Sequence, residues 1–214
     1  MDTFHIAGLS IKVPPQVYPP SEDTFLLMKL LDSHFQKKTL KRRNWRLLEV
    51  GCGSGLITIH TRRLFSSATI FATDISIDAI KTTITNILRN HENPSDYILV
   101  NADLCRCFSS SVQFDYALIN PPYLPYGPAS PWNCSDLMKA AIDGGRTGAE
   151  IINSFLTEVV DRLLVNRIAY VYSTYSEEFI NTNCLLQRGY EVQNHVNQVF
   201  MDETLNAVMW VKDL

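Results

Sequence analysis

The 214-residue sequence lacks features that would place it outside the cell or in a membrane. Its five cysteines are scattered, and none forms the C-x-x-C spacing of a structural zinc site. No N-terminal apolar stretch resembles a signal peptide, and no run reaches the roughly 20 apolar residues of a membrane span. We therefore expect reduced thiols, no bound metal, no membrane contact and a cytoplasmic location, with the nucleus as a further compartment.

Positive charge is also scarce. Lys and Arg number 19 against 22 Asp and Glu, which gives a net charge of -3. This balance makes nucleic acid an unfavourable partner, because proteins that hold a duplex through its phosphates are usually basic. One basic run stands out, and we interpret it as a solvated connector before a strand rather than a docking patch. It consists of Lys37, Lys38, Lys41, Arg42, Arg43 and Arg46.

The chain is short for two hydrophobic cores, since one α/β domain commonly takes about 200 residues. We therefore predict one domain over residues 1–214. Apolar spacing indicates alternating helices and strands, the order typical of an α/β sheet. The predicted helices cover residues 22–37, 56–65, 77–88, 147–164 and 177–187. The predicted strands cover residues 47–50, 69–73, 97–100, 114–119, 169–173, 191–200 and 205–211, the last two as an antiparallel pair.

Three glycines follow the strand at residues 47–50. Gly51, Gly53 and Gly55 have the spacing G-x-G-x-G, which differs from a dinucleotide fingerprint and from a phosphate-binding loop. Glycine has no Cβ and tolerates positive φ, so the backbone there can approach a ligand closely. The alternative is a tight turn that binds nothing.

Acidic residues accompany the ends of three predicted strands. Glu49 precedes the glycines, Asp74 ends the second strand and Asp103 follows the third. Ligands of open α/β sheets bind at this edge, where a carboxylate can accept hydrogen bonds from ribose hydroxyls. Alone, Asp74 would more often be a helix cap, but together these residues predict a nucleoside with ribose at Asp74 and adenine near Asp103. Carboxylates also suit a cationic sulfonium better than a pyrophosphate.

The most specific motif is Asn120-Pro121-Pro122-Tyr123, which follows the strand at residues 114–119. Two consecutive prolines remove backbone donors and fix the direction of the chain. The Asn120 side-chain oxygen and the Pro121 carbonyl can then both accept hydrogens from one substrate NH2 group, while Tyr123 offers a flat face. The alternative is a rigid turn that only ends the strand.

This arrangement suits methylation of an amide or aromatic amine nitrogen. Such a nitrogen is a poor nucleophile because its lone pair is delocalised. Two acceptors for its N–H groups would point the lone pair at a methyl donor and stabilise the positive charge that grows during transfer. Positioning would therefore dominate catalysis, and the proton could leave afterwards.

Taken together, several motifs closely resemble the HemK-type glutamine methyltransferases. They are Tyr18-x-Pro20-x-Glu22-Asp23-Thr24, Glu49-Val50-Gly51-Cys52-Gly53-Ser54-Gly55, Asp74, Asp103 and Asn120-Pro121-Pro122-Tyr123. Gly144-Gly145-Arg146-x-Gly148 resembles the eukaryotic and archaeal branch, which modifies class I translation termination factors. Cys52 departs from the small polar residue often found at its position.

The resemblance implies a Rossmann-like class I methyltransferase fold with about seven mostly parallel strands and an antiparallel C-terminal hairpin. It implies S-adenosylmethionine as donor, the glutamine of a Gly-Gly-Gln motif as acceptor, and a small zinc-binding activator subunit as heterodimer partner on the strand at 97–100. By the same resemblance, Asn120, Pro121, Pro122 and Tyr123 would hold the glutamine amide. The cofactor site would comprise Glu22, Asp23, Thr24, Glu49, Gly51, Gly53, Gly55, Asp74, Asp103, Leu104 and Asn120.

Three other functions remain open at this point. The same Asn-Pro-Pro-Tyr logic serves the exocyclic amine of a nucleobase, although the net charge is acidic. Relatives have also been described as acting on histone lysine, but a tetrahedral amine does not need a clamp for a planar NH2 group. A catalytically silent scaffold is a third alternative, against which the intact Asn120–Tyr123 motif argues.

Overall fold

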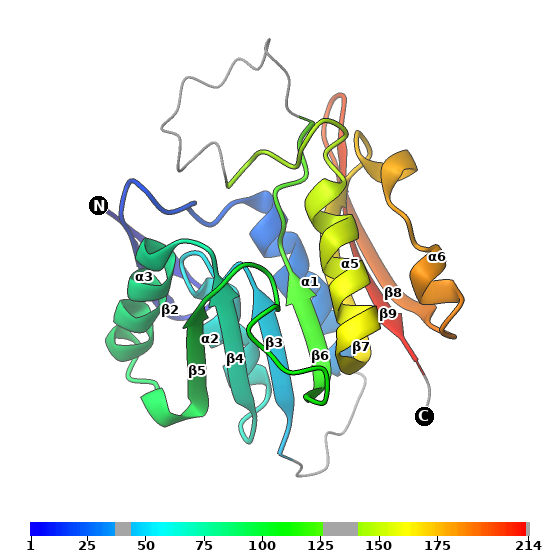
Figure 1. The fold of residues 1–214 in the computed structure, drawn as a ribbon. Helices are drawn as coiled ribbons and strands as arrows, with labels where there is room; N and C mark the ends of the chain where they lie inside the picture. The colour runs from blue at the N-terminus through cyan, green and yellow to red at the C-terminus, as the bar shows by residue number, and fades with distance from the viewer. Residues whose placement is uncertain (37–43, 126–140, 213–214) are drawn as a thin grey trace.

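The computed structural model describes residues 1–36, 44–125 and 141–212. Within them, one mixed sheet has seven strands in the order β5-β4-β3-β6-β7-β9-β8 (Figure 1). Five strands run parallel and the last two antiparallel, as predicted from the sequence. The parallel strands are β5 (Tyr97–Asn101), β4 (Thr69–Asp74), β3 (Arg46–Val50), β6 (Gln113–Ile119) and β7 (Leu164–Ser173), followed by β9 (Thr204–Val211) and β8 (Glu191–Val199).

Helices cover both faces of this sheet (Figure 1). One core cluster joins α1 (Glu22–Gln36) and α2 (Leu56–Leu64) to one face, and another joins α5 (Glu150–Arg162) to the other. Successive strand residues point to opposite faces, so Leu47 packs in the first cluster and Leu48 in the second. No helix in the described ranges is long and apolar enough to cross a membrane.

Two elements predicted from the sequence differ in the structure. The helix predicted at 177–187 is two short pieces, η2 (Glu177–Phe179) and α6 (Asn183–Leu186). Asn153 of α5 causes the break, because its side chain bonds the Phe179 carbonyl and the Asn181 amide and holds the chain between the pieces out of a helix. The strand predicted at 169–173 begins earlier, at Leu164, since β7 pairs with β6 along its first half.

Of the basic run Lys37–Arg46, the structure describes only the last basic residue. Arg46 begins β3, and its guanidinium lies 5.1 Å from the centre of the Phe71 ring. Residues 37–43, which hold the rest of this run, lie outside the described part of the chain.

An N-terminal hairpin, which was not predicted, pairs β1 (Asp2–Ile6) with β2 (Leu9–Val13). The signal for β2 was present, because Leu9, Ile11 and Val13 alternate with polar residues and are buried.

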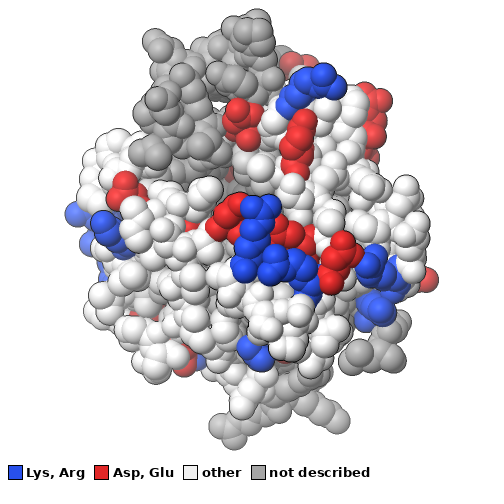
Figure 2. Space-filling model, viewed as in Figure 1, with Lys and Arg blue, Asp and Glu red and all other residues white. Residues whose placement is uncertain are grey.

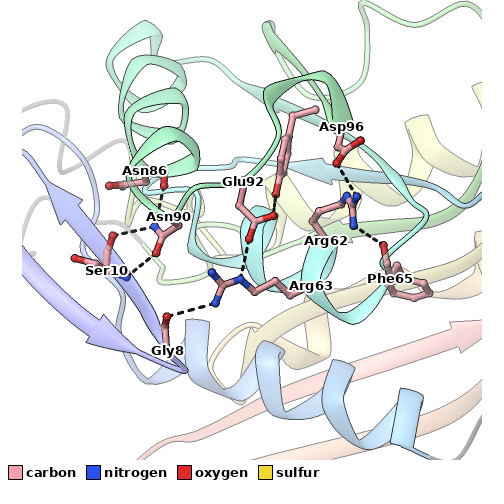
Figure 3. Close-up of polar contacts among 10 residues, drawn as sticks. Gly8, Ser10, Arg62, Arg63, Phe65, Asn86, Asn90, Glu92 and Asp96 are labelled. Carbon is pink, nitrogen blue, oxygen red and sulfur yellow. Dashed lines mark hydrogen bonds and ion pairs between the residues drawn. The ribbon is translucent and has the colours of Figure 1, made fainter.

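Two asparagines hold this hairpin in place, Asn86 within α3 (Ile77–Arg89) and Asn90 at the C-cap of that helix (Figure 3). Asn90 accepts a hydrogen bond from the Ser10 amide at 2.8 Å and donates to the Ser10 carbonyl at 3.0 Å. Asn86 makes the same pair with Lys12, at 2.9 Å each, and also donates to the Ser54 carbonyl at 2.8 Å. Their side chains thus bond β2 much as a neighbouring strand would.

Arginines of α2 fix the base of this arrangement (Figure 3). Arg63 donates to the Gly8 carbonyl in the hairpin turn and pairs with Glu92 at 2.8 Å, while Arg62 pairs with Asp96 at 2.6 Å. These contacts join the hairpin, α2 and the segment after α3, and Asn86 connects the hairpin to the glycine loop through the Ser54 carbonyl.

We expect Asn86→Leu to lower the free energy of unfolding by about 2–4 kcal/mol, because it leaves backbone groups of Lys12 and Ser54 without partners. Asn197→Leu, at an exposed position of β8, serves as the control and should change it by less than about 0.5 kcal/mol. Urea unfolding followed by circular dichroism measures both values. Equal effects of the two variants would contradict this role of Asn86.

Candidate active site

The residues predicted to carry chemistry lie along the carboxyl ends of β3, β4, β5 and β6. Parallel register places Val50 of β3 beside Thr73 of β4 and Ile119 of β6. The glycine loop therefore begins between Asp74 and Asn120, the residues that end β4 and follow β6. A ligand at this edge would contact residues that are far apart in the sequence.

The glycine loop is tied to the end of β4 by its own amides. Gly51 and Cys52 donate to the Thr73 carbonyl at 2.8 and 3.0 Å, and Gly53 donates to Asp74 Oδ2 at 2.9 Å. Gly51 and Gly53 have φ of 76° and 53°, and a Cβ at either position would meet no atom of the described structure within 4 Å. The backbone is thus shaped by glycine on a side that is open to a ligand.

Two polar residues of α3 support the loop from behind. A Cβ on Gly55 would lie 2.9 Å from Thr83 Cγ2, so this glycine lets the helix and the loop pack closely. The Thr83 hydroxyl lies 3.2 Å from the Gly53 carbonyl, and Asn86 binds the Ser54 carbonyl. Sequence reasoning missed both residues. The available signal was two polar residues at helical spacing on a face that proves to be buried.

Cys52 is buried within this support and contacts the Thr83 hydroxyl at 3.3 Å. Burial raises the pKa of its thiol well above the ordinary value, and the nearby Asp74 and Glu49 act in the same direction. The side chain that departs from the family pattern is therefore a neutral packing group, while its backbone amide makes the bond to β4.

Two carboxyl groups lie close to the loop, Glu49 buried and Asp74 partly buried. Burial raises the pKa of Glu49 to about 8; the hydrogen bond from Thr58 opposes this shift and the charge of Asp74 adds to it. Burial also raises the pKa of Asp74, against hydrogen bonds from the Gly53 and Ser76 amides. A cation bound near them would favour their ionised forms, so the pair suits a positively charged ligand.

The segment Asn120–Tyr123, called the acceptor motif below, presents a side-chain oxygen with no hydrogen-bond partner among the described residues. Asn120 Nδ2 lies 3.5 Å from the Thr24 hydroxyl, a long contact. Asn120 Oδ1 is buried and has no hydrogen-bond partner among the described residues. Tyr123 donates to Asp23 Oδ2 at 3.4 Å, and burial raises the pKa of its phenol above the ordinary value. Because buried acceptors are normally bonded, Asn120 Oδ1 is the natural place for a ligand donor.

The segment Gly144-Gly145-Arg146-x-Gly148 forms the other side of this motif. The Gly144 amide donates to the Leu124 carbonyl at 3.0 Å. A Cβ on Gly144 would lie 2.9 Å from the Pro122 carbonyl oxygen, and one on Gly148 would lie 2.3 Å from that of Tyr123. Any side chain at these two glycines would therefore displace the acceptor motif. Sequence analysis recognised this segment only as a mark of its branch.

Three further residues predicted for the site make other contacts. Asp103 is about half exposed and pairs with Arg106, which also pairs with Glu158 at 2.6 Å. Leu104 has a φ of 49°, and its carbonyl accepts the Thr73 hydroxyl at 2.8 Å. Glu22 is exposed in the first turn of α1, where a hydrogen bond from Ser21 lowers its pKa. Asp23 and Thr24, in contrast, contact the acceptor motif directly.

We expect Glu49→Gln to raise the melting temperature of the unliganded chain at pH 8 more than at pH 5. Below the ordinary pKa of about 4.5, Glu49 is protonated in both states and costs nothing. Between that pH and about 8 the unfolded chain loses this proton while the folded chain keeps it, so folding is progressively disfavoured. Glutamine removes this dependence.

Differential scanning fluorimetry over pH 5 to 8 measures the difference between the two proteins. Glu191→Gln, at an exposed position of β8, is the control and should shift the melting temperature equally at each pH. A pH-independent effect of Glu49→Gln would contradict the shifted pKa.

Comparison with known proteins agrees with this geometry. Residues 24–150 match the model of the family described as "Methyltransferase small domain". The chain is 31% identical to a protein of Methanocaldococcus jannaschii named for protein N5-glutamine methyltransferase activity, over 89% of each chain. It is 25% identical to the eRF1 methyltransferase catalytic subunit mtq2 of Schizosaccharomyces pombe, over 94% of this chain and 91% of that one.

Solved structures have the same fold. A chain of the E. cuniculi Mtq2–Trm112 complex, described as responsible for methylation of the eRF1 translation termination factor, superposes with a TM-score of 0.65 and 25% identity. The match covers 92% of this chain and 99% of that one. A methyltransferase of Pyrococcus furiosus matches with a TM-score of 0.64 and 19% identity, over 98% and 91% of the two chains. The chain therefore belongs to the methyltransferase small domain family and is an S-adenosylmethionine-dependent methyltransferase.

Proposed function

We propose that this enzyme methylates the side-chain amide nitrogen of the glutamine in the Gly-Gly-Gln motif of a class I translation termination factor. The observation that carries the proposal is Asn120 Oδ1, a buried acceptor with no partner among the described residues at the end of β6. An amide NH2 group supplies the donor that this oxygen lacks. The names of the M. jannaschii and S. pombe relatives support the same chemistry.

The edge beside Asn120 fits S-adenosylmethionine. Gly51 and Gly53 leave the loop open to a ligand, and the acids Glu49 and Asp74 suit a positive charge. When bound, this cofactor supplies a methyl group activated by its sulfonium. Asp74 already accepts two backbone N–H bonds, but a carboxylate has about four acceptor positions, so it retains room for ribose hydroxyls. We place Asp103 and Leu104 at the adenine, and Glu22, Asp23, Thr24 and Gly55 around the remainder.

Catalysis in this proposal is positioning of the acceptor nitrogen. Asn120 Oδ1 and the Pro121 carbonyl would each accept one N–H of the glutamine amide, and the ring of Tyr123, next to Pro122, would lie against its plane. Both N–H bonds strengthen as positive charge grows on the nitrogen, which stabilises the transition state rather than the bound substrate. The high pKa of Tyr123 keeps its hydroxyl protonated, so it acts as a donor to Asp23 and not as a base.

A small zinc-binding activator subunit would bind at the opposite end of the sheet from β8. There β5 is an edge strand, with backbone groups available for pairing with another chain. Ile98 of β5 and Ile84 and Leu88 of α3 are exposed apolar residues beside this edge. Apolar groups gathered at an open edge are typical of a protein interface. The E. cuniculi relative is described as a two-protein complex, which supports a small partner subunit for this chain.

A nucleobase amine is less favoured as the acceptor, although it too carries a planar NH2 group. On the face drawn in Figure 2, the Lys and Arg of the described residues are interspersed with Asp and Glu and form no continuous basic surface. Phosphate binding would call for such a surface. A lysine acceptor fits less well, because its tetrahedral amine matches neither the paired acceptors nor the flat ring. Action on a termination factor also favours a cytoplasmic location.

The first test is methyl transfer from labelled S-adenosylmethionine to a class I termination factor, with the activator subunit present. We expect label on the native factor and none on a factor whose Gly-Gly-Gln glutamine is replaced by alanine. Peptide mass spectrometry locates the methyl group. Equal labelling of both factors, or faster labelling of an oligonucleotide, would refute the proposed acceptor.

A second test concerns the role of Asn120. We expect Asn120→Ala to reduce kcat by about 100-fold or more, since it removes an acceptor that is used mainly in the transition state. The dissociation constant of S-adenosylmethionine, from isothermal titration calorimetry, should stay within a few-fold of the original value. Asn197→Ala is the control at an exposed position. Parallel loss of cofactor binding and turnover would assign Asn120 to the cofactor instead.

A further inference from the structure

Asp23 is a buried carboxylate that joins the first turn of α1 to the acceptor motif. Its side chain is 4% exposed. Oδ2 lies 3.3 Å from the Tyr18 hydroxyl and 3.4 Å from the Tyr123 hydroxyl. Both phenols donate to this oxygen. Burial beside this carboxylate raises the pKa of both tyrosines, which keeps the two donor protons in place.

The other oxygen of Asp23 determines the direction of the Thr24 hydroxyl. Oδ1 accepts the Thr24 amide at 2.6 Å and the Thr24 hydroxyl at 3.1 Å. A hydroxyl has one hydrogen, and here it is given to Asp23. The Thr24 oxygen can therefore only accept from its remaining neighbours, the Ser21 amide at 3.3 Å and Asn120 Nδ2 at 3.5 Å.

This direction has a consequence for the Asn120 amide. With an acceptor at Thr24, the NH2 end of Asn120 turns toward α1, and the Oδ1 end is left buried and unbonded among the described residues. The reversed amide would place its oxygen against the lone pairs of Thr24. It would also present N–H donors to the N–H donors of a substrate amide, which would repel an NH2 group rather than bind it.

We propose that Asp23, acting through Thr24, sets the orientation of the Asn120 amide so that an oxygen faces the acceptor nitrogen, and that its bond to Tyr123 fixes the tyrosine ring beside it. Asp23 and Thr24 are thus positioning residues, in addition to any contact with the cofactor. The inference rests on the proposed function, because only a planar NH2 acceptor requires this orientation.

The test compares two substitutions of one side chain. Thr24→Val keeps the size of the side chain and removes the hydroxyl, whereas Thr24→Ser keeps the hydroxyl. With the full-length chain and the activator subunit, we expect Thr24→Val to lower kcat by about 100-fold, the scale of a misplaced reacting group. The KM for the termination factor should change by less than about 3-fold, and the dissociation constant of S-adenosylmethionine, which Thr24 would help to hold, should rise far less than kcat falls. Thr24→Ser should recover most of the turnover.

A second readout does not depend on activity. In 15N-labelled protein, the side-chain NH2 signals of Asn120 are identified by their loss in Asn120→Ala. We expect one of its proton signals to shift upfield in Thr24→Val, because its hydrogen-bond acceptor is gone, and to stay in place in Thr24→Ser. This spectrum needs no protein substrate, so it decides on the amide orientation even if the termination factor is not methylated.

Three results would overturn the inference. One is unchanged turnover in Thr24→Val, and another is a loss of cofactor affinity that matches the loss of turnover. The third is an Asn120 NH2 signal that is the same in Thr24→Val as in the original chain. A failure of the original enzyme to label the factor would instead reject the proposed acceptor, which separates the two questions.

Discussion

The amides of Gly51, Cys52 and Gly53 donate in succession to Thr73 and Asp74, and this attachment of the glycine loop to the end of β4 underlies the rest of the site. The acceptors are the Thr73 carbonyl and the Asp74 side chain at the end of β4, and these bonds turn the loop away from the sheet. The open faces of Gly51 and Gly53 and the carboxylate of Asp74 come together as a result. Because this backbone is already ordered, a ligand that binds at this edge does not incur the entropic cost of ordering the loop.

The acceptor motif depends on glycines and polar groups from distant segments. Gly144 and Gly148 approach the backbone of Pro122 and Tyr123 too closely for any side chain. From the other direction, α1 brings Asp23 and Thr24 to Tyr123 and Asn120. The motif is thus held between two segments that contact it from opposite directions. A clamp that must place one nitrogen against a methyl group needs this rigidity, because small displacements cost large factors in rate.

The site contains carboxyl groups in surroundings that disfavour their ionised forms. Glu49 is buried and Asp74 is partly buried; burial raises the pKa of both carboxyl groups, and the charge of Asp74 adds to the shift at Glu49, which disfavours folding at neutral pH. In the proposed site a cationic cofactor would offset that cost when it binds, so part of its affinity would come from these two carboxyl groups. The same acids would repel a pyrophosphate, which helps to explain why the G-x-G-x-G loop need not cradle a phosphate.

Local pattern determined much of this protein. The alternation of strands and helices, the glycines after β3 and the prolines after β6 predicted the sheet and the edge at which these residues meet, because periodicity and backbone restriction act within a few residues.

Tertiary structure decided the rest. Ile77, Ile84 and Leu88 of α3 are exposed while Thr83 and Asn86 are buried, since the partners of these polar groups lie about 30 and 74 residues away in the sequence. The break before α6 comes from Asn153, and the direction of the Asn120 amide comes from a carboxylate 97 residues earlier, at Asp23. Hydrogen bonds of this kind leave no periodic trace, because they depend on which segments the folded chain brings together.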